Sequence, residues 1–134
     1  MPNYQGVWSL STQYQNRTGW PRVPGSQIAL FSGGNDGSNT LNTIQTIQID
    51  TLGNATDFGD LTLARYFTTA CSSSTRGVFG GGANYSAGGE QNVIDYVSFS
   101  SAGNATDFGD LTLARVRLGA CSNAVRGLFA GGED

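Results

Sequence analysis

The sequence GNATDFGDLTLAR occurs twice in this chain, at 53–65 and, letter for letter, at 103–115. The similarity extends further: FSGG at 31–34, FGGG at 79–82 and FAGG at 129–132 correspond, as do NTIQTIQIDTLGN at 42–54 and NVIDYVSFSSAGN at 92–104. An offset close to 50 residues therefore relates most of the chain to itself. Such a period is typical of folds in which each repeat is one supersecondary unit that packs on its neighbours.

Composition and local pattern predict β-structure within each repeat. The 134 residues include 20 glycines, and Gly costs about 1 kcal/mol in a helix interior. Four short segments of the second repeat have strand character and are separated by turn residues; they are 66–74, 76–81, 92–100 and 105–111. Four short strands in about 50 residues are typical of one blade of a β-propeller. We therefore expect an all-β chain.

The order of these motifs resembles the kelch repeat over roughly residues 26–132. Arg65 is followed by a small-residue strand, by Phe79 before a double glycine, and by a strand that ends at Tyr96. Phe108 stands where kelch blades usually have Trp, and the segment 42–50 is more polar than a kelch strand. The resemblance implies kelch-like propeller blades, divided into an N-terminal arm or attachment segment (1–25), blade one (26–75), blade two (76–125) and a strand of a partial blade (126–134).

Two blades and part of a third cannot close a ring, because propellers have about four to eight blades. The C-terminal residues match the first two strands of another blade, and segment 4–10 places Trp8 where a last strand would have its aromatic residue. We therefore expect the C-terminal strands of one subunit to complete a blade with the N-terminal strands of the next. Such head-to-tail contacts form a ring when the rotation closes. Two or three copies give six blades, and we favour a homotrimer.

The amino-acid sequence of the repeat also resembles the kelch-like repeats common in virion and tail-fibre-like proteins of marine bacteriophages. That resemblance implies a structural protein of the virion, either a capsid decoration or a fibre component, that assembles in the host cytoplasm and contacts other virion proteins. The alternative is an oligomeric lectin that binds carbohydrate between its blades, with a host-surface glycan as ligand.

Charge and residue types disfavour several other classes of function. The formal net charge is −3, and the chain has neither Lys nor His. Nucleic-acid binding requires clustered positive side chains, and His is the usual general base and a common metal ligand. No apolar run approaches the roughly 18 residues of a membrane span. We expect no enzymatic activity, no cofactor, no metal, no nucleic-acid partner and no membrane insertion.

Five residues are candidates for ligand or partner contact: Trp8, Trp20, Tyr85, Arg65 and Arg115. The two tryptophans are outside the repeat and are expected to be docking anchors, because large amphipathic rings dominate interface energies. Tyr85 lies in a glycine-rich loop and is the best single candidate for contact with a ligand.

The repeated arginines, Arg65 and Arg115, allow two interpretations. One is a ring of guanidinium groups around a central channel, able to bind a carboxylate or a sugar acid. The other is structural: each arginine pairs with an aspartate of its own repeat, such as Asp60 or Asp110, through charge-assisted hydrogen bonds. The cysteines Cys71 and Cys121 also occupy equivalent positions, and we expect both to be buried, reduced thiols.

Overall fold

The computed structural model describes residues 27–134, which form antiparallel β-sheets without an α-helix in that part of the chain. The first sheet has three strands in the order β1 (Ile28–Asn35), β2 (Thr40–Gln48) and β3 (Thr56–Asp60). The second has four, in the order β4 (Thr69–Ser72), β5 (Arg76–Gly80), β8 (Val93–Ser98) and β9 (Thr106–Asp110). The third pairs β10 (Gly119–Ser122) with β11 (Gly127–Ala130).

The sequence-based expectation of all-β structure is confirmed for residues 27–134, and each of the four predicted segments of the second repeat contains one strand of the second sheet. The repeat boundary that we placed at 75/76 falls between β4 and β5, which pair in one sheet. A fifth feature was not predicted. The glycine-rich loop folds into a small hairpin of β6 (Ala83–Asn84) and β7 (Gly89–Glu90), joined by the 3-10 turn η2 (Tyr85–Ala87).

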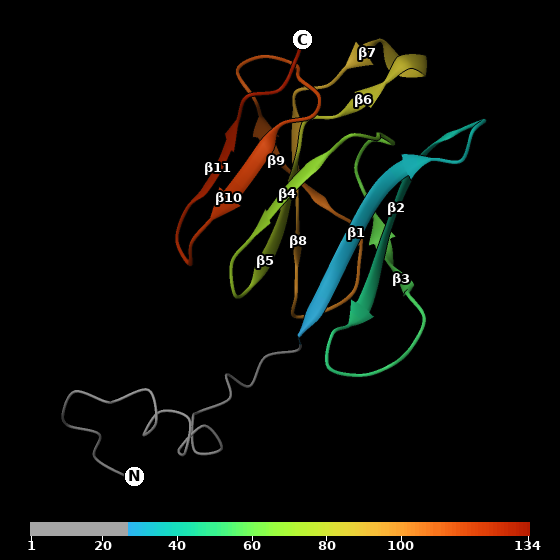
Figure 1. The fold of residues 1–134 in the computed structure, drawn as a ribbon, viewed down its shortest axis with the longest axis vertical. Helices are drawn as coiled ribbons and strands as arrows, with labels where there is room; N and C mark the ends of the chain where they lie inside the picture. The colour runs from blue at the N-terminus through green and yellow to red at the C-terminus, as the bar shows by residue number, and fades with distance from the viewer. Residues whose placement is uncertain (1–26) are drawn as a thin grey trace, which may run out of the picture.

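The second sheet lies between the first and the third, so the order of the sheets in space follows their order in sequence (Figure 1). At each glycine turn, a backbone amide donates a hydrogen bond to the linker that leads into the next sheet. The Gly34 amide donates to the Arg65 carbonyl at 3.1 Å, and the equivalent Gly82 amide donates to the Arg115 carbonyl at 2.9 Å. Gly81 has φ +63°, and a Cβ there would lie 2.6 Å from the same Arg115 carbonyl oxygen. Glycine is therefore required by both conformation and space.

A hydrophobic core fills the interface between the first and second sheets. It consists of Ile44, Phe58, Leu61, Phe79 and Val97. Ile44 and Phe58 lie on β2 and β3, whereas Phe79 and Val97 lie on β5 and β8. The strands of the two sheets thus bury one face of each against the other, as layered β-folds must.

The counterparts of these core residues that do not face a complete neighbouring sheet are more exposed to solvent. Phe58 is 6% exposed, but Phe108, at the same place in an identical segment, is 59% exposed. Phe79 is 2% exposed, whereas its counterpart Phe31 on β1 is 55% exposed. The reason is the number of neighbouring strands: Phe108 faces a third sheet of only two strands, and the described residues place no sheet over β1. Burial here depends on neighbours and not on local sequence.

This contrast predicts unequal costs for the same substitution. Phe58→Ala should lower the free energy of unfolding by about 3–5 kcal/mol, because it opens a cavity in a closed core. Phe108→Ala should cost less than about 1 kcal/mol, since the ring is largely in solvent already. Urea denaturation followed by circular dichroism measures both, with Phe58→Leu as a milder variant if Phe58→Ala does not fold. Equal losses at the two positions would contradict the environments described above.

Candidate functional site

The strongest polar feature is a buried ion pair that joins the first sheet's linker to the second sheet. Arg65 Nη2 donates to Asp95 Oδ2 at 2.9 Å, and both side chains are 0% exposed. Thr62 donates twice to the same carboxylate, from Oγ1 to Oδ1 at 2.5 Å and from its amide to Oδ2 at 3.2 Å. Asp95 therefore accepts three charge-stabilising hydrogen bonds from one short linker.

Local structure explains why these groups meet. Thr62 and Arg65 follow β3, on the linker that crosses to the second sheet. Asp95 lies opposite Phe79 in the β5–β8 register, on the face that contacts the first sheet. Asp95 and Val97 are two residues apart and both buried, because alternate residues of a strand share a face. One strand thus contributes both a carboxylate and an apolar side chain to the interface.

The environment of Arg65 makes the pair hard to break. Burial lowers the pKa of the Arg65 guanidinium from its ordinary value, and the Asp95 carboxylate acts in the opposite direction. Arg65 Nε and Nη1 are buried without a hydrogen-bond partner in the described part of the chain, while Nη2 also lies 3.5 Å from the Phe79 carbonyl oxygen. Loss of Asp95 would leave a buried cation with no counter-charge.

The structural interpretation of Arg65 was therefore right about an aspartate partner but wrong about which one. We expected Asp60 of the same repeat, and the partner is Asp95 of the next. Asp60 instead uses its backbone at this interface: its amide donates to Asn104 Oδ1 at 3.1 Å, and its carbonyl accepts from the Ala105 amide at 2.7 Å. The arginine lies on a crossing linker, so its side chain enters the sheet ahead of it.

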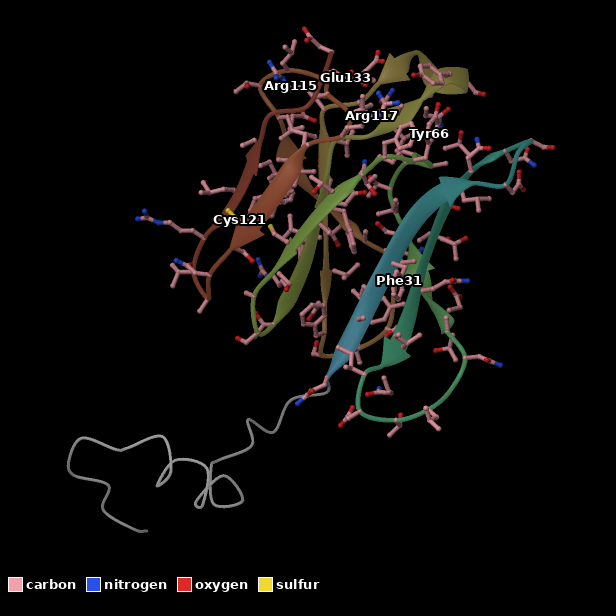
Figure 2. The ribbon with its side chains drawn as sticks, in the orientation of Figure 1. Phe31, Tyr66, Arg115, Arg117, Cys121 and Glu133 are labelled. Carbon is pink, nitrogen blue, oxygen red and sulfur yellow. The ribbon has the colours of Figure 1, made fainter. Side chains whose placement is uncertain are left out.

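Arg115 occupies the equivalent linker before the third sheet but has no carboxylate partner among the described residues. Its Nη1 donates to the Gly131 carbonyl at 3.2 Å. A pocket of about 210 Å³ opens beside it, with Thr112, Leu118 and Phe129 among the lining residues. Arg115 thus points towards the third sheet, close to the C-terminal end of the described chain (Figure 2).

Tyr85 lies at the tip of the small hairpin and is 66% exposed. Its ring meets that of Tyr66 edge-on at a centroid distance of 5.8 Å, and Tyr66 in turn meets Phe67 at 4.8 Å. Arg117 lies over the Phe67 ring at 4.7 Å and forms an ion pair with Glu133. Partial burial, and then the neighbouring Tyr85, raise the pKa of Tyr66. We call Tyr66, Phe67, Tyr85 and Arg117 the aromatic cluster; Tyr66 and Arg117 are labelled in Figure 2.

Sequence reasoning identified Tyr85 but missed the other members of this cluster, and it also missed Thr62 and Asp95. One signal was available for Tyr66 and Phe67. They directly follow the identical segment, and the second copy continues with Val116 and Arg117 instead. A difference immediately after thirteen identical residues could have drawn attention to these positions. Trp8 and Trp20 lie outside the described residues.

The two cysteines differ from expectation in their burial. Cys71 is half-buried and Cys121 is exposed, and both are free thiols. Their strands, β4 and β10, lie side by side at the junction of the second and third sheets, where Ser122 Oγ donates to the Ser72 carbonyl at 2.7 Å. Burial, followed by the nearby Cys121, raises the pKa of the Cys71 thiol. Cys121 is exposed because the third sheet has only two strands.

Comparison with known protein families and with curated protein sequences finds no match for this chain. The resemblance to the kelch repeat therefore depends on the motif residues alone. Within residues 27–134, no three of the His, Cys, Asp and Glu side chains gather as a metal site would require. The same residues include no helix long and apolar enough to cross a membrane.

The buried ion pair predicts a large effect of a small substitution. Asp95→Asn should lower the free energy of unfolding by about 3–5 kcal/mol, because Arg65 then stays buried without its counter-charge. Asp107→Asn is the matched control: Asp107 is exposed on β9 and, within residues 27–134, its side chain accepts only from the Gly109 amide at 3.0 Å, so its loss should be within about 0.5 kcal/mol. Chemical denaturation compares the two. Similar stabilities for both variants would rule out a structural role for the pair.

Proposed function

We propose that this protein is a non-enzymatic structural component of a bacteriophage virion, a capsid decoration or a fibre component, that displays a kelch-like β-propeller. In this proposal each sheet is a blade. The support is the repeated order of motifs, the placement of the sheets in sequence order, and the amino-acid sequence of the repeat, which resembles kelch-like repeats of marine bacteriophage virion proteins. The role is display: rigid blades hold the loops outward, and residues 1–25 attach the protein to a neighbour.

The observation that carries the proposal is the loss of cover at both ends of the row of sheets. Phe31 on β1, Phe108 on β9 where it faces the two-stranded third sheet, and Leu128 on β11 are 55%, 59% and 62% exposed. Repeat arrays need their terminal units covered to remain soluble. A propeller covers them by packing each blade on two neighbours. Further chains, including copies of this one arranged head-to-tail, would bury these side chains.

Self-association is therefore the first test. The purified chain should form a closed oligomer, with three copies favoured, in native mass spectrometry and light scattering. Phe31→Asp should dissociate it, because an unpaired charge would enter an apolar interface. Leu52→Asp is the control, since Leu52 lies in a loop and is fully exposed. A wild-type chain that remains monomeric at tens of micromolar overturns the homo-oligomer.

The location in a virion requires a separate measurement. Peptide mass spectrometry of purified phage particles should detect this chain at a constant ratio to the capsid protein, and imaging of the particles should place it on the surface. Its absence from particles, with retained expression in infected cells, overturns the virion assignment.

A lectin is the second candidate, and the aromatic cluster favours it. Tyr85 and Phe67 are 66% and 47% exposed, and Arg117 adds a cation beside them. Aromatic rings with a polar neighbour present an apolar surface and a polar edge together, a combination that suits the face of a sugar ring.

The lectin candidate predicts binding on a glycan array that Tyr85→Ala weakens by more than about tenfold, the equivalent of about 1.4 kcal/mol. The melting temperature should not change, because Tyr85 is exposed at the tip of η2. Ser86→Ala, next to it on the same turn, is the control. An array without hits removes this candidate and leaves the display role.

A further inference from the structure

In the third sheet one strand edge is unpaired among the described residues, whereas the corresponding edge in the second sheet pairs with another strand. In the second sheet β5 pairs with β4 on one side and β8 on the other. In the third sheet the equivalent strand, β11, pairs with β10 alone among the described residues. The free side of β11 thus corresponds to the position of β8, the strand that carries Asp95. An open edge of this kind is a template for another strand.

A pocket with polar side chains in its lining lies beside this edge, and we call it the receptor pocket. Thr112 and Arg115 belong to the segment that is identical to 53–65, where Thr62 and Arg65 hold the Asp95 carboxylate. Arg115 Nη1 donates to the carbonyl of Gly131, directly after β11, whereas Arg65 approaches the carbonyl of Phe79, which corresponds to a position two residues earlier in the repeat. The pocket of about 210 Å³ lies between these groups and β11. The Arg115 guanidinium and the Thr112 hydroxyl in its lining are groups that can donate to a carboxylate.

An apolar space accompanies the polar one. In the closed interface, Val97 packs in a cluster with Phe58 and Phe79. The counterparts of those two rings, Phe108 and Phe129, line a pocket of about 400 Å³ between the second and third sheets. A strand beside β11 would present alternate residues to this interface. An aspartate and an apolar residue two positions later would therefore meet the two pockets together.

We propose that Thr112 and Arg115 bind the aspartate of a β-strand from a partner polypeptide, and that this strand pairs with the free edge of β11. The partner segment has the pattern of residues 93–97, VIDYV: an aspartate opposite Phe129 and an apolar side chain two residues on, against Phe108. The ligand is a peptide strand with one essential carboxylate, which is strand addition with a charged anchor.

The folded strands of a second copy do not meet this requirement. Asp95 is buried and already paired within its own molecule. Gln45 holds the corresponding position on β2, and residues 1–26 contain no Asp or Glu. An N-terminal arm of another copy therefore brings no carboxylate to Arg115. The inference rests on the proposed completion of the third sheet and names the chemistry of the strand that completes it.

A synthetic peptide of residues 91–111 is the probe, since it contains the sequences of β8 and β9. The full-length chain, labelled and held at nanomolar concentration to limit self-association, should bind this peptide saturably. Replacing Asp95 of the peptide by asparagine, with its other two aspartates kept, should weaken binding about 30-fold or more, because one partner of a buried charge pair is lost. Arg115→Ala in the protein should weaken binding to a similar degree, and Thr112→Val to a smaller one.

Arg117→Ala is the matched control, because it removes the same charge two residues away and outside the pocket. It should leave peptide affinity within about twofold, as expected of a site without direct contact. Circular dichroism verifies that each variant is folded. If Arg115→Ala is unfolded, the aspartate and asparagine peptides on the wild-type protein decide the matter.

The outcomes separate this inference from the proposed function. Equal affinity for the two peptides, or no binding of either, overturns the proposal that Thr112 and Arg115 bind the aspartate of a partner strand. A monomeric chain that discriminates between the peptides overturns the homo-oligomer and supports that proposal. An oligomer that binds neither peptide does the reverse.

Discussion

The interface between the first and second sheets depends on one buried guanidinium and one buried carboxylate. Two charges taken out of water cost several kcal/mol each and recover that cost only when the geometry is good. Here the Thr62 hydroxyl and amide complete the shell around Asp95. Apolar residues of similar volume would often be as stable, so we infer that the pair mainly fixes register. It admits one position of the second sheet against the linker and penalises all others.

The repeated segment shows that the burial of a residue is not decided by its local sequence. Thirteen residues with the same sequence form the same strand twice, at Thr56–Asp60 and Thr106–Asp110, with the same bulge in the pairing. Yet Gly59 packs against the backbone of Gly103 and Asn104, whereas nothing lies within 4 Å of a Cβ built on Gly109. Backbone geometry follows the sequence, while burial follows the presence of a complete neighbouring sheet.

The same distinction explains what the sequence could predict. Strand positions and the two-strand third sheet follow from residue pattern and repeat offset, which are properties of one repeat. The partner of Arg65 could not be found in this way, because Asp95 lies thirty residues ahead on another sheet and the first repeat has Gln45 in its place. The hairpin at Ala83–Glu90 could not be recognised, because the residues of its two strands, Ala, Asn, Gly and Glu, are poor strand formers. The exposure of Cys121 was missed because burial had been assumed from the repeat alone.

The linker after each sheet forms hydrogen bonds with the part of the chain that follows it. The two ends of the row of sheets are therefore not equivalent. Cationic donors stand at one end, at Arg115, and an amide, Gln45, stands in the carboxylate's place at the other. The two ends are different in chemistry, so a contact between one end of a copy and the opposite end of the next joins unlike surfaces. A ring built from such head-to-tail contacts has distinguishable front and back faces.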